Sequence, residues 1–174
     1  MIQANWLEFC RIFDTTRSYV LATIIETRGS TYQKTGAMML VDELGNCFGL
    51  LSGGCLEADI SLHAKSALSS NENVLLSYDL KADADLLWGL GLGCEGALDI
   101  LLIPITPHNR HQTFDKLLDS VSSHQSGVYI LPCDVSSNKK QSLAKFIQAP
   151  IQADVSLEPC LLYTSPSPRD RTRS

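Results

Sequence analysis

The sequence lacks the cysteine and histidine spacings of a structural zinc site. Six cysteines and four histidines occur in 174 residues. They form no C-x-x-C pair and no H-x-x-x-H pair, and structural zinc modules depend on such paired ligands. The N-terminus also lacks a basic region followed by an apolar core, so we expect no secretory signal. Scattered cysteines without such a signal favour reduced thiols in a cytoplasmic protein that holds no metal of its own.

An excess of basic residues and a long apolar run are absent as well. Lys and Arg number 14 against 19 Asp and Glu, which gives a net charge of −5. This balance argues against a general nucleic-acid binder or a binder of anionic membranes. No apolar run reaches the roughly 18 residues that a membrane-spanning helix needs. With 44% hydrophobic and 19% charged residues, the composition is typical of one soluble domain with a sizeable core.

The pattern along the chain predicts helices and strands that alternate irregularly. Asp42–Asn46 has the composition of a hairpin turn. Because this hairpin comes early, we expect one α/β or α+β domain with a mixed β-sheet and flanking helices. Apolar periodicity predicts helices over residues 2–16, 55–68, 82–90, 112–123 and 137–148, and strands over 19–27, 37–41, 47–51, 74–80, 97–105 and 127–133.

Residues 161–174 differ from the rest of the chain in composition. They contain two prolines, three arginines and no apolar periodicity. One interpretation is a disordered linker. The other, which we favour, is a coding sequence that was cut and continues into unrelated residues. We therefore assign the domain to residues 1–160 and exclude the tail from the fold.

The segment Ser52-Gly53-Gly54-Cys55-Leu56-Glu57 connects a predicted strand to a helix that is expected to begin at Cys55. Free backbone N–H groups and the positive end of the helix dipole suit an anion such as phosphate. They would also favour the thiolate of Cys55. The alternative is a tight turn that needs small residues, with Cys55 as a small buried apolar side chain.

Two further loops contain residues suited to binding. The Arg28–Gly36 loop carries two cations and several hydroxyls, Ser30 and Lys34 among them, and either contacts an anion or is a solvated surface loop. The Gly89–Gly96 loop, which includes Gly93 and Cys94, is not a dinucleotide fingerprint because it precedes a strand rather than a helix. If the three loops meet at one edge of the sheet, they form a pocket suited to a phosphate and to soft-metal or sulfur chemistry.

Three motifs in this order, Gly29–Met39, Ser52–Glu57 and Gly91–Gly96, resemble the N-terminal domain of the XdhC/CoxI family. These are accessory proteins of xanthine dehydrogenase and carbon monoxide dehydrogenase. The similarity covers roughly residues 4–105 and extends more weakly to about 160. It implies a maturation factor that binds the molybdenum cofactor (molybdopterin) transiently and delivers it to a xanthine dehydrogenase-like molybdenum hydroxylase. A cysteine desulfurase partner and a homodimer are further expectations.

The resemblance also implies a set of site residues, with Cys55 and Cys94 as the candidate thiols. Two departures from the family matter. Glu95 stands beside Cys94, where a carboxylate would raise the pKa of the thiol. The C-terminal Rossmann-like domain of family members is not present, so functions that need it are not expected. The implied cofactor-binding residues are Ser30, Lys34, Ser52, Gly53, Gly54, Cys55, Glu57, Gly93, Cys94 and Gly96.

Three functional classes remain open at this stage. The first, which we favour, is a cofactor-insertion chaperone without catalytic activity. The second is a thiol-dependent oxidoreductase or sulfur-transfer enzyme that uses Cys55 or Cys94 as its nucleophile. The third is an interaction module whose glycine-rich loops serve only packing. No Ser–His–Asp arrangement is visible in these loops, so a hydrolase is poorly supported.

Overall fold

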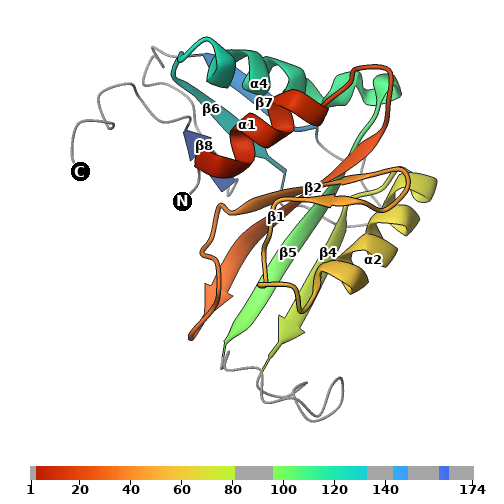
Figure 1. The fold of residues 1–174 in the computed structure, drawn as a ribbon, viewed down its shortest axis with the longest axis vertical. Coiled ribbons are helices and arrows are strands. Elements are labelled where there is room, and N and C mark those ends of the chain that lie inside the picture. Colours follow the sequence, from red (N-terminus) through yellow and green to blue (C-terminus); the bar gives the residue numbers. More distant parts are fainter. Residues whose placement is uncertain (1–2, 81–95, 133–142, 149–160, 165–174) are drawn as a thin grey trace. The chain divides into compact units, whose positions relative to one another are not determined.

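The computed structural model describes residues 3–80, 96–132, 143–148 and 161–164. Two compact units are present, residues 19–104 and residues 1–18 together with 105–174. We call them the five-stranded unit and the three-stranded unit (Figure 1). The predicted helix over 82–90 lies outside the described residues. Within the described part of the chain, no helix is long and apolar enough to cross a membrane.

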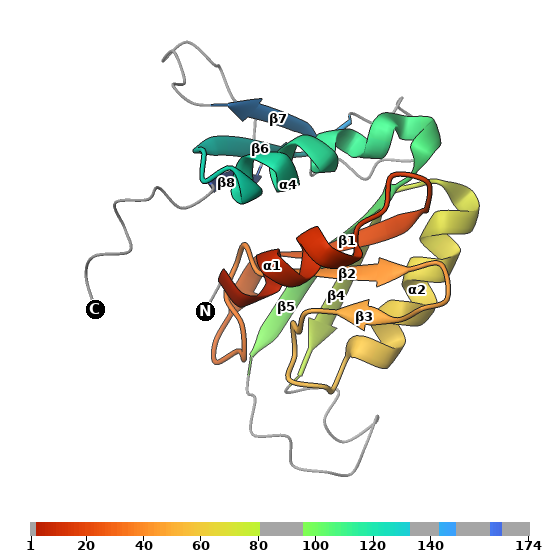
Figure 2. The ribbon, with the colours of Figure 1, turned by 45° about the horizontal axis from the view of Figure 1, so that its top comes forward.

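The five-stranded unit is a sheet in the order β3-β2-β1-β5-β4. Strand β1 pairs antiparallel with β2, β2 with β3, and β4 with β5, and Figure 2 shows the β2–β3 hairpin from the side. Apolar β-branched runs form the inner strands, as the sequence predicted. The bounds are β1 Tyr19–Arg28, β2 Met38–Asp42, β3 Cys47–Phe48, β4 Val74–Asp79 and β5 Ala97–Ile105.

Helix α2, Glu57–Ser70, covers one face of this sheet (Figures 1 and 2). It buries Ile60, Ala64 and Ala67 against the side chains of β1 that point to the same face. Alanines at this spacing let the helix backbone approach the sheet closely. The helix begins at Glu57 rather than at Cys55 as predicted, because Leu56 is its N-cap residue and the Leu56 N–H is accepted by the Ser52 hydroxyl.

The β2–β3 hairpin is held by the buried Asp42 side chain. Its Oδ1 accepts hydrogen bonds from the backbone N–H groups of Leu44 and Asn46, both at 2.9 Å. The Gly45 carbonyl then accepts a hydrogen bond from the Ser61 hydroxyl of α2 at 2.8 Å. A side chain at Gly45 would collide with Ser61 and Lys65. The hairpin predicted over residues 42–46 is confirmed, and it ties the sheet to the helix that follows the Ser52–Gly54 turn.

The three-stranded unit has the strand order β7-β6-β8, with β6 Gly127–Leu131, β7 Lys145–Gln148 and β8 Leu161–Thr164. Both strand pairs are antiparallel. Helices α1, Gln3–Ile12, and α4, Phe114–Ser122, pack against each other. Their contact is aromatic: Phe114 lies 6.4 Å from Trp6, 6.3 Å from Phe9 and 6.1 Å from Tyr129, measured between ring centroids.

Two predictions in this unit were wrong in part. Residues 145–148 form strand β7 rather than the end of a helix, because Phe146 and Ile147 pair with β6 and suit a pleated strand. Residues 161–164, which we assigned to the tail, form β8 and pair with β6. Residues 137–142 and 165–174 lie outside the described residues. The expected α/β or α+β class, a sheet with flanking helices, is confirmed.

A left-handed backbone segment connects β5 to α4. It is the end of the 3₁₀ segment η1, Pro107–Thr113, in which residues 110–113 have φ between 49° and 58°. Left-handed conformation costs non-glycine residues roughly 1–2 kcal/mol each. Hydrogen bonds to β7 offset this cost: Gln112 Oε1 accepts from the Ala144 N–H and Thr113 Oγ1 from the Phe146 N–H, both at 2.7 Å. The strained turn thus caps an edge strand.

We expect Asp42→Ala to lower the free energy of unfolding by roughly 2–3 kcal/mol, because three donors around a buried carboxylate lose their acceptor. Chemical denaturation followed by circular dichroism measures this loss. The control is Glu72→Ala, which removes an exposed carboxylate after α2 and should change stability by less than about 0.5 kcal/mol. Equal effects of the two substitutions would contradict the assigned role of Asp42.

Candidate functional site

The Ser52 turn is occupied by a carboxylate of the chain itself. Glu57 Oε1 accepts hydrogen bonds from the backbone N–H groups of Leu51 at 3.0 Å and Ser52 at 2.8 Å. Glu57 Oε2 accepts a hydrogen bond from the Ser52 hydroxyl at 2.6 Å. That hydroxyl in turn accepts the Leu56 N–H at 2.8 Å. The site residues Ser52 and Glu57 therefore form an internal, helix-capping pair.

The electrostatics agree with this geometry. Burial pushes the pKa of Glu57 up, but the hydrogen bonds from the Ser52 hydroxyl and from the backbone of Ser52 and Leu51 outweigh it, so the pKa lies below its ordinary value. Glu57 is therefore ionised at neutral pH. The backbone donors of Leu51 and Ser52, where we predicted an anion site, already hold an anion.

The next two residues keep the features of a ligand site. Gly53 and Gly54 have φ of 77° and 102° and are exposed. Within the described part of the chain, nothing accepts a hydrogen bond from their N–H groups. A Cβ added at Gly54 would meet no atom within 4 Å, so the turn faces open space. An incoming anion would find its donors here, one step beyond the Ser52–Glu57 pair.

The ring of Tyr32 borders this turn. A Cβ at Gly53 would lie 3.2 Å from Tyr32 Cδ2, so the missing side chain leaves room for the ring. Tyr32 is nevertheless 57% exposed, which is unusual for so large an apolar surface. We did not select Tyr32 from the sequence, although it lies within the first motif. Its ring brings the Arg28–Gly36 loop to the Ser52–Gly54 turn, and part of the predicted convergence is thereby confirmed.

Gly96 brings the third loop to the first. A Cβ on Gly96 would lie 2.4 Å from the Ser30 carbonyl oxygen and 2.7 Å from that of Arg28. Only glycine permits this close backbone approach. Ser30, an exposed residue, therefore meets Gly96 through its main chain. Gly93 and Cys94 lie outside the described residues, and so does Glu95.

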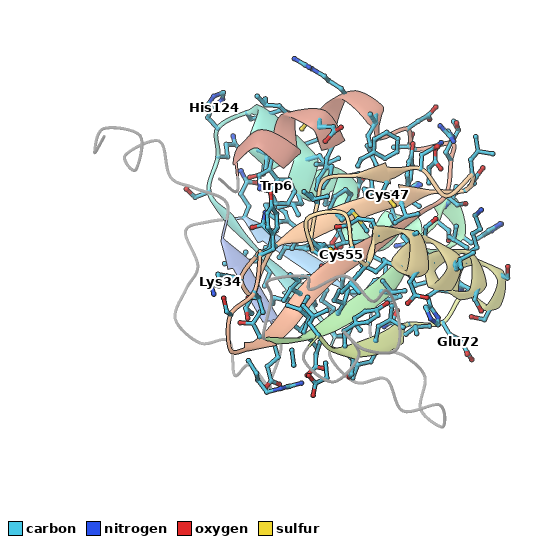
Figure 3. The ribbon with its side chains drawn as sticks, turned by 60° about the horizontal axis from the view of Figure 1, so that its bottom comes forward. Trp6, Lys34, Cys47, Cys55, Glu72 and His124 are labelled. Atoms are coloured by element: carbon cyan, nitrogen blue, oxygen red, sulfur yellow. The ribbon has the colours of Figure 1, made fainter. Side chains whose placement is uncertain are left out.

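The two cations of the first loop differ in their surroundings. Arg28 donates to both carboxylate oxygens of Asp99, at 2.9 and 3.3 Å, and lies 2.9 Å from Glu26. The hydrogen bond from Arg28 holds the pKa of Asp99 below its usual range. Arg28 is thus committed to two carboxylates rather than to a ligand, contrary to our expectation. Lys34 is exposed, and no ion pair joins it to a described residue, but Figure 3 shows it apart from Cys55.

Cys55 precedes α2 by two residues and packs, half-buried, against the core of the five-stranded unit. Cys47, which we did not single out, is also half-buried (Figure 3). Its Sγ lies 3.7 Å from the Glu57 carbonyl oxygen. Burial raises the pKa of Cys47, and Glu57 and Asp42 add to the effect. Among the described residues, no cluster of His, Cys, Asp and Glu could hold a metal ion.

Comparison with known proteins places this geometry in a family. Residues 13–79, which include the Arg28–Gly36 loop and the Ser52–Glu57 segment, match the model of the XdhC and CoxI family. Residues 13–79 belong to the XdhC and CoxI family. The resemblance predicted from the motifs is thereby confirmed, and we call this part of the chain the XdhC/CoxI segment.

Three relatives illustrate the similarity. The chain is 35% identical over 117 residues to a probable xanthine dehydrogenase subunit of Bacillus subtilis, which covers 67% of this chain and 35% of that protein. It is 31% identical over 83 residues to the molybdenum cofactor insertion chaperone PaoD of Escherichia coli, covering 48% and 25%. A crystal structure of a xanthine dehydrogenase from Bacillus halodurans matches with a TM-score of 0.69 and 34% identity, covering 84% of this chain and 43% of that one.

These matches span a limited part of each relative. The aligned segments account for 35% and 25% of the two curated relatives, so the chain corresponds to about a third of their length or less. The XdhC/CoxI segment contains the Gly53–Gly54 turn, Tyr32 and the Ser52–Glu57 pair. The structural match covers most of this chain, so it includes both the sheet and the loops described above.

We expect Glu57→Gln to reduce stability at neutral pH and to flatten its dependence on acidic pH. The folded-state pKa of Glu57 is lowered, so the ionised carboxylate stabilises the fold above its ordinary value of 4.5, and this stability is lost as the pH falls below it. Urea denaturation from pH 7 to pH 3 tests this. The difference between wild type and variant should shrink below pH 4.5; a constant difference would contradict the role of the charge. Glu72→Gln is the control.

We expect Gly96→Ala to lower the free energy of unfolding by at least about 1–3 kcal/mol, because its methyl group would overlap two main-chain oxygens that cannot rotate away. Thermal denaturation of both variants measures the effect. Ser30→Ala, the control, removes an exposed hydroxyl from the same contact but leaves the carbonyl in place and should be nearly neutral. A harmless alanine at position 96 would show that the two loops do not meet as described.

Proposed function

We propose that this chain is part of an accessory protein that binds the molybdenum cofactor as cargo, for the maturation of a xanthine dehydrogenase-type molybdenum hydroxylase. The observation that carries the proposal is the exposed Gly53–Gly54 turn, whose N–H groups have no acceptor in the described structure, within the segment that matches the XdhC and CoxI family. The similarity to a protein named as a molybdenum cofactor insertion chaperone supports it.

The residues around the turn fit the chemistry of this cargo. The cofactor carries a phosphate, for which two adjacent N–H donors on a left-handed turn are suited. It also carries a flat pterin ring, and the exposed ring of Tyr32 offers a surface for stacking. The Cys55 thiol follows the turn directly and could approach a soft metal or its sulfur ligands. These groups would hold and orient the cargo; the molybdenum chemistry belongs to the client enzyme.

The architecture of the turn suits transient binding. Glu57 fixes the Ser52 side of the turn internally, so the ligand need not organise the backbone when it binds. The remaining donors are exposed, and their strength is reduced by water. Such a site gains little energy beyond what the ligand itself brings, which favours release to a client over permanent retention. The finer expectations, a cysteine desulfurase partner, a homodimer and a cytoplasmic location, stay predictions.

The enzyme hypothesis is less well supported by the described residues. A catalytic thiol needs an activating partner within hydrogen-bond reach. No histidine or carboxylate in the described structure donates to or accepts from the Cys55 thiol, and its sulfur packs against apolar side chains. Cys94, the other candidate nucleophile, lies outside the described residues.

The test is retention of released cofactor. The protein is mixed without oxygen with molybdenum cofactor released from a molybdoenzyme, passed through a desalting column, and assayed for molybdenum and for pterin fluorescence. We expect retention by the wild type and at least a tenfold loss in Cys55→Ser and in Tyr32→Leu. Cys10→Ser changes a half-buried cysteine of the three-stranded unit and should retain the cofactor. Folded wild-type protein that retains neither molybdenum nor pterin would refute the proposal.

A further inference from the structure

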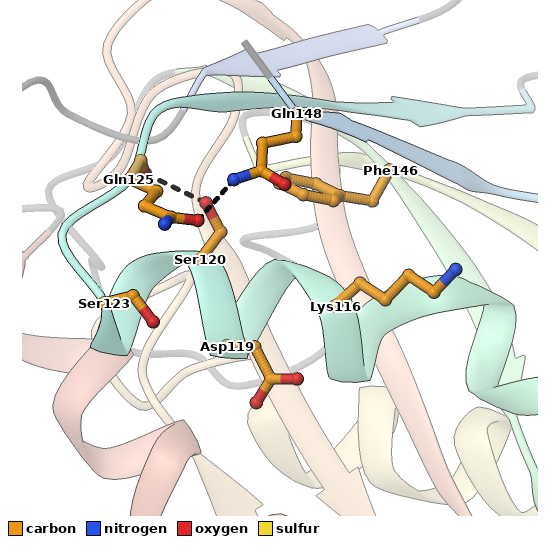
Figure 4. A pocket seen from close by; sticks show the side chains of 7 residues that line it. All are labelled: Lys116, Asp119, Ser120, Ser123, Gln125, Phe146 and Gln148. Carbon is orange, nitrogen blue, oxygen red and sulfur yellow. Dashed lines mark hydrogen bonds between the residues drawn. The ribbon is translucent and has the colours of Figure 1, made fainter.

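A second site lies in the three-stranded unit, in a cavity of about 360 Å³ between α4 and β7. Figure 4 shows that helix α4 forms one wall and that Phe146 and Gln148 of β7 face it. The volume falls within the range of small-molecule sites, about 300–1,000 Å³. This cavity belongs to a different unit from the Gly53–Gly54 turn, and it plays no part in the proposed function.

The cavity follows from a glycine in the sheet. Gly127 is paired with Gln148 in the β6–β7 register, and Tyr129 with Phe146, so these four residues point to the same face of the sheet. Tyr129 fills its share of the layer beneath α4 with a buried ring. Gly127 has no side chain to fill its share, and the Phe146 ring leans into the space: a Cβ on Gly127 would lie 2.2 Å from Phe146 Cζ. The ring is thereby fixed with part of its surface toward the cavity.

The polar groups of the cavity are held in place by one another. Ser120 is buried, and its hydroxyl donates to the Gln125 carbonyl at 2.9 Å. The Gln148 amide nitrogen donates to the Gln125 side-chain oxygen, as the dashed lines in Figure 4 show. This bond leaves the Gln148 side-chain oxygen, on an exposed residue, as an acceptor at the cavity. Fixed amides beside an aromatic ring are suited to recognising the edge of a flat heterocycle.

Two charged residues complete the lining. Lys116 and Asp119 are one helical turn apart on α4, and both are exposed. An ammonium group suits a phosphate, and a carboxylate can accept hydrogen bonds from sugar hydroxyls. One cation opposite one anion does not suit an extended polyanion, and the net charge of −5 disfavours a nucleic-acid strand.

We propose that this cavity binds a mononucleotide. The base stacks on Phe146 with its edge toward Gln148, Lys116 contacts the phosphate, and Asp119 accepts hydrogen bonds from the ribose. Stacking on an aromatic side chain contributes about 1–3 kcal/mol per base, and the phosphate contact adds a charge-assisted interaction. The combination matches every chemical group of a mononucleotide to a group of the lining.

The experiment is titration of the full chain with AMP, GMP, CMP and UMP, followed by saturation-transfer NMR. We expect transfer to the base protons for at least one of them and a Kd below about 1 mM. Phe146→Leu keeps apolar packing over Gly127 and should weaken binding roughly tenfold, the lower bound expected for a lost stacking contact. Lys116→Ala should weaken the monophosphate to the affinity of the matching nucleoside.

Lys145→Ala is the matched control, because Lys145 is an exposed lysine on β7 that points to the opposite face of the strand from Phe146. It removes the same charge and should leave binding unchanged. No saturation transfer from any of the four nucleotides at millimolar concentration would overturn the proposal. Binding that survives both Phe146→Leu and Lys116→Ala, or that inorganic phosphate abolishes at equal concentration, would overturn it too. Lys116 is exposed, so its variant remains informative if Phe146→Leu folds poorly.

Discussion

The described site depends on the carboxylate of Glu57 at the Ser52 turn. A strand that ends in glycines before a helix leaves backbone donors without partners. Here the first residue of the helix turns its own side chain back to fill two of them. The Ser52 hydroxyl links this carboxylate to the Leu56 N–H, so one network fixes the turn and the start of α2. The exposed donors of Gly53 and Gly54 are positioned as a consequence.

The two sheets meet the same problem of unpaired backbone groups in different ways. In the five-stranded unit, the Asp42 carboxylate collects the donors of the hairpin, and Ser61 ties that hairpin to α2. In the three-stranded unit, the side chains of Gln112 and Thr113 cap the edge of β7 from a left-handed turn. Both solutions use polar side chains as substitutes for a neighbouring strand. The second requires strained backbone, which persists because several hydrogen bonds determine it together.

Glycines act in three distinct ways in this protein. Gly96 permits two loops to touch main chain to main chain, and Gly53 gives space to the ring of Tyr32. Gly127 leaves a layer between sheet and helix unfilled, so that Phe146 occupies part of it and a cavity remains. Of these, the Gly53–Gly54 turn also needs the left-handed φ that other residues avoid. A glycine-rich motif in a sequence therefore does not by itself indicate a phosphate site; what approaches each glycine decides its role.

The sequence alone determined the strands with continuous apolar and β-branched residues, such as β1 and β5, because local periodicity and burial agree there. It also determined the hairpin at Asp42 and, through the order of three motifs, the family. Tertiary structure decided which charges are available to a ligand. Arg28 pairs with Asp99, 71 residues away, and Glu57 binds its own turn, although both looked free in the linear pattern. It also made residues 145–148 a strand, because the partners of that strand come from β6 and from the turn before α4. Such pairings depend on distances between segments remote in sequence, and local periodicity carries no information about those distances.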